Sequence, residues 1–256
     1  MGTLEYEKTK LTRGEIFEWL LVYSMWMHGL EVLVGAGGWD YFPTLEEDKL
    51  KAYARRFRFV EVNSTFYRVP KLATVRSWRR RVPPDFKFSV KCNRVATHDC
   101  ELKPVDKTFR ALKRMFMVCT LLRSEMLVLQ TPSSLWVDED KVEVISTILN
   151  NLNPGKVQVY WETRTPWSAE VEKKVRRVML EKGIIPVVDL SREDPVLGTE
   201  VVYSRLFSRG ELLYGDEVFE KINGHISKSK AERFVLTFHG TSMYRDAARY
   251  IELKSQ

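Results

Sequence analysis

The chain has 256 residues, of which 44% are hydrophobic, 12% aromatic and 29% charged. This composition excludes an intrinsically disordered protein, and the length is sufficient for one large domain with a full core. Lys and Arg number 41 against 34 Asp and Glu, and the net charge of +7 is compatible with a polyanionic partner such as nucleic acid. Three cysteines are too few for a disulfide framework, so we predict a reducing, cytoplasmic compartment.

The first 30 residues differ in pattern from the rest of the chain. Three basic residues precede an apolar run over residues 19–27, which is weakly typical of a secretory signal. Glu15 and Glu18 interrupt that pattern, no small-residue cleavage site follows, and the run is shorter than the ~20 residues that a membrane helix needs. We therefore predict an N-terminal helical extension over residues 1–30, a domain over residues 31–256, and no membrane partner.

From Glu31 onward, short runs of β-type residues alternate with segments of helical periodicity. This alternation is typical of parallel βαβ units, and eight units in about 225 residues predict a single-domain (β/α)₈ TIM barrel. The eight predicted strands are Val32 to Gly37, Phe59 to Asn63, Phe86 to Lys91, Leu127 to Gln130, Val157 to Glu162, Ile185 to Asp189, Val201 to Phe207, and Phe234 to His239.

The segments between the strands carry helix start and stop signals. Thr44 and Glu47 have the spacing of a capping box, so we expect the first helix after Glu31 to begin there. Gly183 follows a run of valines at helical spacing and is predicted to end the fifth helix. The interval between the sixth and seventh strands carries Pro195 and Gly198 and is predicted to hold a loop or a single turn.

The alternation of side chains assigns one face of each strand to the barrel interior. In the third strand Phe86, Phe88 and Val90 are predicted to face the helices, which places Ser89 and Lys91 inside. The same parity makes the interior polar at the C-terminal ends of the strands, where barrel enzymes have their active sites. Burying so many polar groups is costly unless they are paired or functional, so we predict a functional site there. The other inward polar residues are Glu61, Asn63, Lys87, Gln130, Gln158, Tyr160, Glu162, Asp189, Tyr203, Arg205, Thr237 and His239.

Several motifs along the chain resemble one known family. They are the segments 34–39, 60–70 and 86–91, then Thr97-His98, Gln130-Thr131-Pro132, Glu162-x-Arg164-x-x-Trp167 and Tyr203-Ser204-Arg205. Together they resemble the YecE-like family, the domain of unknown function 72, over about residues 32–253. The resemblance implies a TIM barrel of the general architecture of endonuclease IV and xylose isomerase. It implies no reaction, because the activity of the family is not established.

Two positions depart from the family's pattern. Phe207 stands where the family has a His, and His239-Gly240 stands where an Asn-Asn pair is usual. Roles of the seventh and eighth loops are therefore not carried over. The matched positions are Glu61, Asn63, Lys91, His98, Glu162 and Arg164.

The favoured hypothesis is hydrolysis of a small phosphate-containing substrate, with nucleic acid retained as a candidate. Lys91, Arg164 and Arg205 would bind phosphate oxygens. Glu61 and Glu162 would act as acid–base groups, with His98 transferring a proton. Asn63, Tyr67, Gln130 and Trp167 are the remaining predicted substrate contacts.

A divalent metal is a candidate cofactor. Glu162, Asp189 and His239, with Glu61 opposite, would supply oxygen and imidazole ligands. Arg205 opposes this assignment because its positive charge repels a cation.

Two alternatives stay open. Lys91 could form a Schiff base with a carbonyl substrate, as in a lyase, although Glu61 and Glu162 favour a charged, ion-paired lysine. The mouth could instead bind a small polar or sugar-like ligand without catalysis, with Trp39, Tyr67 and Trp167 as its walls.

The sequence also contains a basic run, Arg76-Ser77-Trp78-Arg79-Arg80-Arg81, which follows arginines at 55, 56 and 58. Such a run is either a nucleic-acid footprint or the solvated outer face of two barrel helices.

Overall fold

The computed structural model describes residues 29–196, 198–208 and 213–254. The predicted N-terminal helical extension lies outside these residues except for its last two positions. The elements are β1 (Glu31–Ala36), α2 (Lys49–Arg56), β2 (Phe59–Val62), α3 (Ser64–Tyr67), α4 (Leu72–Arg80), β3 (Lys87–Lys91), η1 (Val95–Asp99), α5 (Asp106–Leu122), β4 (Met126–Gln130), α6 (Glu139–Leu152), β5 (Gln158–Glu162), α7 (Ala169–Glu181), β6 (Ile184–Val188), β7 (Val201–Phe207), α8 (Asp216–Lys228), β8 (Arg233–His239) and α9 (Met243–Lys254).

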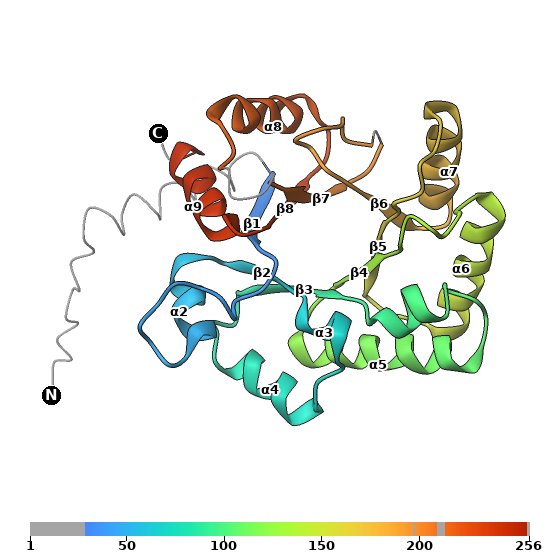
Figure 1. Cartoon of the computed structure of the whole chain (residues 1–256), viewed down its shortest axis with the longest axis horizontal. Coiled ribbons are helices and arrows are strands. Elements are labelled where there is room, and N and C mark those ends of the chain that lie inside the picture. Colours follow the sequence, from blue (N-terminus) through green and yellow to red (C-terminus); the bar gives the residue numbers. More distant parts are fainter. Residues whose placement is uncertain (1–28, 197, 209–212, 255–256) are drawn as a thin grey trace, which may run out of the picture.

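The eight strands form one closed parallel barrel in chain order, with β8 paired to β1. Helices surround the strands on the outside (Figure 1). This is the predicted TIM barrel, and each predicted strand matches an observed one to within about a residue or two at its ends. Because all strands run the same way, their C-terminal ends meet at one mouth.

The core has two parts, one on each side of the barrel wall. Outward side chains such as Phe88 and Val90 belong to a large apolar cluster shared with the surrounding helices. A smaller cluster fills the barrel interior and is apolar except for two tyrosine hydroxyls. Its members are Leu33, Phe59, Met126, Val128, Tyr160, Val187, Tyr203 and Val235. The barrel interior is therefore mainly apolar beneath the mouth and polar at the mouth itself, where the strands have their C-terminal ends.

Two local predictions are confirmed and one is wrong. Gly183 follows the last turn of α7 with a φ of +69°, and no helix occupies the described residues between β6 and β7. The predicted start at Thr44 is wrong, because Asp48 is the N-cap of α2 and its carboxylate accepts a hydrogen bond from the Lys51 N–H. The Thr44 hydroxyl instead accepts from the Glu46 N–H in the preceding loop.

The start of the barrel depends on a close approach between β1 and β2. A Cβ atom at Gly35 would lie 2.1 Å from the Phe59 carbonyl oxygen. The Tyr53 hydroxyl joins the same two strands, because it donates to the Phe59 carbonyl and accepts from the Ala36 N–H, both at 2.8 Å. Glycine is thus required at position 35 by packing.

Within the described part of the chain, no helix is long and apolar enough to cross a membrane.

Candidate active site at the barrel mouth

A buried arginine occupies the centre of the mouth. Arg205 on β7 is 2% exposed and donates two hydrogen bonds to Glu61 at the end of β2, at 2.9 and 3.2 Å. Its third contact is an ion pair with Glu162 at the end of β5. Arg164 also donates to Glu162, at 2.7 Å. Arg205 therefore forms an ion pair with a carboxylate on each side, and Arg164 supplies the second positive charge.

A hydroxyl network holds this ion pair from below. The Tyr203 hydroxyl donates to Glu61 at 2.9 Å and lies 2.7 Å from the Ser89 hydroxyl, and Thr237 donates to the same tyrosine at 3.3 Å. These three hydroxyl-bearing residues lie on the interior face of their strands. Each comes two residues before a mouth residue of the same strand: Ser89 before Lys91, Tyr203 before Arg205, and Thr237 before His239. Buried polar groups that are hydrogen-bonded in this way are fixed in position.

For both Glu162 and Arg205, burial and the neighbouring charges shift the pKa in opposite directions. Burial favours the protonated form of Glu162, yet the guanidinium groups of Arg205 and Arg164 hold its pKa below the ordinary value. Burial disfavours the charge on Arg205, but Glu61 and Glu162 more than compensate and raise its pKa. Both groups are therefore charged at neutral pH.

Lys91 at the end of β3 is the cation of the mouth that this network does not neutralise. Its ammonium nitrogen lies 4.2 Å from the centre of the Phe66 ring. No carboxylate of the described residues lies within ion-pairing distance of it. Burial, and then Arg205, lower its pKa to about 8, and the more distant Glu61 and Glu162 only partly oppose this. A sizeable fraction of Lys91 is thus a free amine near pH 8.

His98 contacts the same aromatic ring, Phe66. Its ring meets Phe66 edge to face at 4.9 Å, and its Nδ1 atom is 2.9 Å from the Thr97 hydroxyl. Burial and the positive charge of Lys91 lower the pKa of His98, so the imidazole is neutral at pH 7. Lys91 and His98 are therefore two proton acceptors that contact the same aromatic ring.

The short helix α3 positions that ring. The Thr65 hydroxyl contacts the Val62 and Lys91 carbonyls at 2.7 Å each. The Asn93 side-chain amide donates to the Thr65 and Phe66 carbonyls. These contacts link β2, α3 and the end of β3, so they hold Phe66 over Lys91.

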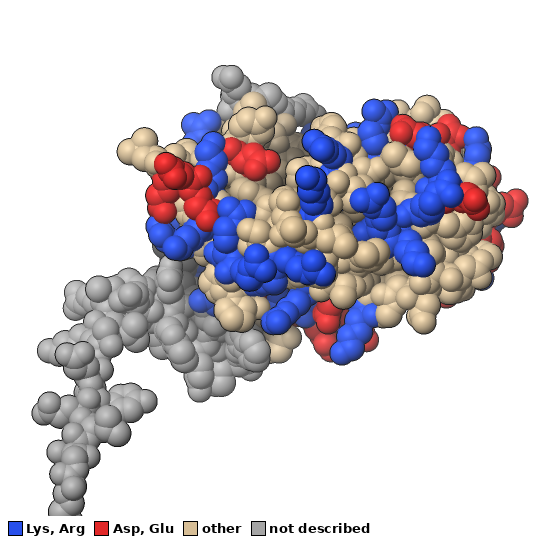
Figure 2. Space-filling model, turned by 90° about the horizontal axis from the view of Figure 1, so that it is seen from below, with Lys and Arg blue, Asp and Glu red and all other residues tan. Residues whose placement is uncertain are grey.

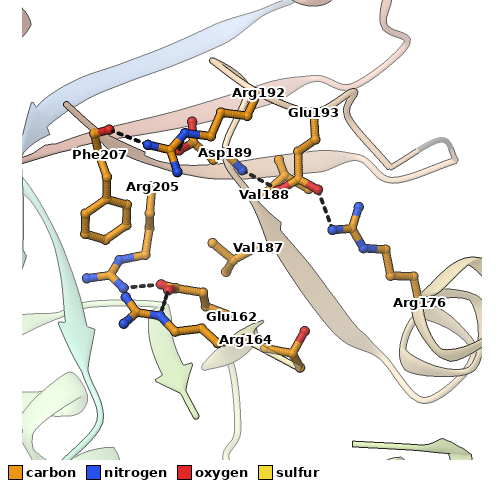
Figure 3. Close-up of a pocket in the computed structure, with 11 residues that line it drawn as sticks. Glu162, Arg164, Arg176, Val187, Val188, Asp189, Arg192, Glu193, Arg205 and Phe207 are labelled. Atoms are coloured by element: carbon orange, nitrogen blue, oxygen red, sulfur yellow. Dashed lines mark hydrogen bonds and ion pairs between the residues drawn. The ribbon is translucent and has the colours of Figure 1, made fainter. Parts of the chain in front are cut away.

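A cavity of about 280 Å³ opens beside the ion pair, between β5, β6 and β7. Figure 3 shows Arg164 and Arg205 converging on Glu162, with the Phe207 ring above them. The guanidinium carbons of these two arginines lie 5.7 and 5.2 Å from the centre of that ring. The other labelled lining residues are Arg176, Val187, Val188, Asp189, Arg192 and Glu193.

The opposite side of the mouth is closed by His239 and Asn63. His239 stacks on Phe207 at 4.6 Å, and its Nε2 atom is 3.8 Å from Glu61. Burial, reinforced by Arg205, lowers its pKa well below the usual value, so it is neutral. The Asn63 amide donates to the Gly37 carbonyl at 2.9 Å. A Cβ at Gly37 would lie 2.4 and 2.5 Å from these two side chains.

A comparison with protein families identifies the family to which this chain is related. The sequence model described as "Protein of unknown function DUF72" matches residues 33–254. The chain belongs to the DUF72 family. The resemblance carried by the sequence motifs is therefore confirmed.

Known proteins are similar to this DUF72 chain in sequence or in fold. The UPF0759 protein YecE of Escherichia coli strain K12 is 28% identical over 167 residues, which are 63% of this chain and 60% of that protein. A DUF72 family protein of Thermotoga maritima matches with a TM-score of 0.67 and 22% identity, covering 88% of this chain and 100% of that one. D-psicose 3-epimerase matches with a TM-score of 0.55 and 11% identity, covering 86% and 98%. These two structural matches show the fold alone.

The structure brings most of the predicted site residues of this DUF72 chain to one mouth. Glu61, Glu162 and Arg205 form the central ion pairs, and Arg164 joins them. Gln130 is buried at the end of β4, where it pairs in register with Glu162. Lys91, His98 and Asn63 lie around this centre as described above.

The expected ion-paired state of Lys91 is wrong. Arg205 forms the close ion pairs with both Glu61 and Glu162, so Lys91 contacts an aromatic ring in place of a carboxylate.

Two of the three predicted aromatic walls, Trp39 and Trp167, are also wrong, whereas Tyr67 stays a prediction. Trp39 is 6% exposed and packs edge to face on Trp78 at 5.2 Å, so it belongs to the core. Trp167 donates to the Val137 carbonyl at 2.7 Å and packs against the same core. Tyr67 is 77% exposed and contacts its neighbour Phe66. None of the three lines the cavity of Figure 3.

The three predicted metal ligands are not assembled. Among the described residues, no group of three or more His, Cys, Asp or Glu side chains is placed to hold a metal ion. Glu162 faces Arg205, whereas Asp189 accepts from the Ser191 N–H at 3.1 Å in its own loop. Burial raises the pKa of Asp189. The guanidinium of Arg205 occupies the position between the carboxylates where a cation would bind, so this donor set does not fit a metal.

Two aromatic residues of the site, Phe66 and Phe207, were not predicted as site residues from the sequence. Phe207 follows Tyr203 and Arg205 at the same parity, so the alternation rule that placed those two residues inside also predicts Phe207 there. Phe66 lies in a four-residue helix, for which strand parity gives no direction.

Proposed function

We propose that this DUF72 protein is an enzyme in which the Lys91 amine reacts with the carbonyl group of a small, anionic, polar substrate. The observation that carries the proposal is the state of Lys91. It lies on an aromatic ring, away from carboxylates, and its pKa is lowered to about 8. A lysine that is desolvated or placed beside another cation is activated as a nucleophile in this way.

The geometry also supports a negatively charged substrate. Arg205 balances one of the two central carboxylates, and Arg164 balances the other. Lys91, when protonated, leaves one positive charge in excess. Arg164 is partly exposed beside the cavity and keeps donors free for a phosphate or carboxylate group.

The reaction would follow Schiff-base chemistry. The Lys91 nitrogen attacks the substrate carbonyl carbon, and the carbonyl oxygen leaves as water. When the β carbon of the substrate carries a hydroxyl group, the bond between its α and β carbons can break in the protonated imine. The bonding electron pair moves to the nitrogen and gives an enamine, the hydroxyl proton is released, and the β carbon leaves as an aldehyde or ketone. Protonation and hydrolysis of the enamine then free Lys91 and the second product. The neutral imidazole of His98 is the candidate base for the hydroxyl proton.

Borohydride trapping tests this proposal directly. Purified protein is treated with borohydride and a panel of small aldehydes and ketones that carry phosphate, carboxylate or no charge. The expected result is one reduced adduct per chain, mapped to Lys91, with anionic carbonyls preferred over neutral ones. Lys91→Met should form no such adduct. The matched control Lys87→Met, at the exposed opposite end of the same strand, should react like the wild type.

Adducts spread over many lysines, or unchanged in Lys91→Met, would contradict the proposal. Arg164→Met tests the anion contact separately. We expect it to weaken trapping of anionic carbonyls by roughly 10-fold, the loss of one charge-assisted hydrogen bond of about 1.5 kcal/mol, and to leave neutral carbonyls unaffected.

Hydrolysis of a phosphate-containing substrate is the second candidate. The observation in its favour is the excess of cations beside the cavity, which suits a phosphate group. Its weakness is that Glu61 and Glu162 are held by arginines, so a carboxylate base is missing and Lys91 or His98 would have to accept the proton. Phosphate release from esters without any trapped adduct would favour this candidate. Binding of the same compounds without turnover would favour a ligand-binding barrel.

A further inference from the structure

The positive charge of the chain is concentrated in one part of the sequence. Residues 49–123 contain 20 Lys and Arg but only 5 Asp and Glu, a net charge of +15. The remaining residues contain 21 and 29, a net charge of −8. The modest overall charge of +7 therefore conceals a strongly basic segment from α2 to α5 and an acidic remainder.

The fold gathers part of this charge on one outer face. Helices α4 and α5 pack side by side on the outside of the barrel, and Figure 2 shows Lys and Arg side chains crowded over this side of the molecule. We call this surface the α4–α5 face and define it by six exposed residues, Arg76, Arg80, Lys107, Lys113, Arg114 and Arg123.

These six cations are not neutralised within the described structure. Other basic residues of the segment have acidic partners, for example Arg81 with Asp48 and Arg110 with Asp106. No carboxylate among the described residues forms an ion pair with any of the six on the α4–α5 face. The one acidic residue of α4 and α5, Asp106, pairs with Arg110, so this surface is predominantly positive and attracts polyanions.

The other residues of the face indicate which polyanion fits. Among the described residues of α4 and α5, Met117 is the exposed large apolar side chain, at 44%. No exposed aromatic residue accompanies it on these two helices. A surface for single-stranded nucleic acid usually offers aromatic rings on which bases stack, and a membrane-binding surface offers exposed aromatic and leucine side chains. Both classes fit this face poorly.

We propose that the α4–α5 face binds the phosphate backbone of double-stranded nucleic acid without reading its sequence. The cations of this face are solvated and lie on two adjacent helices without exposed aromatic rings. Such an arrangement suits contacts to the two rows of phosphates of a duplex. This site is separate from the mouth and does not depend on the reaction proposed for Lys91.

Fluorescence anisotropy with the nuclease-treated full-length protein tests this inference. Labelled 24-base-pair duplexes of DNA and RNA are titrated at several salt concentrations. We expect binding that weakens with salt, with a slope of log K against log salt of about −0.9 for each phosphate neutralised on DNA. The DNA and RNA titrations identify which duplex is preferred.

Two quadruple variants separate the face from the overall charge. Replacing Arg76, Arg80, Lys113 and Arg114 by Ala removes four charges from the face. We expect a loss of affinity of at least ~30-fold at 100 mM salt and a slope that is shallower by up to about 3.6. The matched control removes four exposed charges elsewhere, by replacing Lys156, Lys173, Lys228 and Lys230 with Ala. It should change the affinity by less than about 3-fold.

Several results would overturn the inference. They are the absence of salt-dependent duplex binding by the wild type, an equal loss in both variants, and tighter binding of single strands than of duplexes. Binding to phosphatidylserine vesicles without duplex binding would also overturn it and assign the face to a membrane. Circular dichroism of both variants checks that the helices are intact, and a Lys-to-Gln and Arg-to-Gln version replaces either set that fails this check.

Discussion

For the charged residues of the mouth, the sequence predicts their position but not their ion-pair partners. Strand parity correctly placed Glu61, Lys91, Glu162 and Arg205 at the interior. It did not predict the pairing, because three cations compete for two carboxylates and sequence gives no distances. Arg205 forms the close pairs because its planar guanidinium reaches both carboxylates at once, whereas Lys91 donates from a single point.

The ion pairs of Arg205 should contribute strongly to the stability of the protein. Replacing Arg205 by Met leaves Glu61 buried without its cation, and Glu162 retains only Arg164. We expect the free energy of unfolding, measured by urea denaturation at pH 7, to fall by about 3–5 kcal/mol.

Stability should recover partly in the Arg205→Met, Glu61→Gln double variant, since that change removes the uncompensated charge. A loss below about 1 kcal/mol in the single variant would show that the ion pair is not what holds the mouth together.

The strands and helices were predicted more completely than the contacts between side chains. Alternating β-type runs identified all eight strands, and the Pro- and Gly-containing interval between β6 and β7 was correctly expected to lack a full helix. The start of α2 was missed because Thr44 and Asp48 both carry capping signals, and only tertiary packing decides between them. The short α3, which carries Phe66, has no periodicity to detect.

The close approach of β1 and β2 at Gly35 can be tested by substitution. Gly35→Ala would push a Cβ against the Phe59 carbonyl oxygen, which is backbone and cannot move aside. We expect the loss of at least ~3 kcal/mol in thermal or urea unfolding, or failure to fold.

Gly224→Ala is the matched control for this change. Gly224 lies within α8 with open space around it, so alanine there should stabilise the protein by about 0.5–1 kcal/mol. Equal effects of the two substitutions would refute the close approach of β1 and β2.

The whole molecule is a barrel with an apolar lower interior, a polar mouth and an uneven distribution of charge. Its single-barrel architecture could be predicted from the sequence because each βα unit repeats the same signals. The lowered pKa of Lys91 could not be predicted from the sequence, since it arises from groups on four strands. Burial at the end of β3, Arg205 on β7 and Arg164 after β5 lower its pKa, and Glu61 and Glu162 oppose them.

The pH dependence of Lys91 acylation tests this account most directly. Trace amounts of an amine-reactive anhydride are applied across pH 6–11, and modification of each lysine is quantified by peptide mass spectrometry. An amine reacts only when it is deprotonated, so a lowered pKa moves its reactivity to lower pH. We predict a midpoint near pH 8 for Lys91, well below the ~10.4 of an ordinary lysine. A Lys91 midpoint at or above the ordinary ~10.4 would contradict a reactive lysine at the centre of the site.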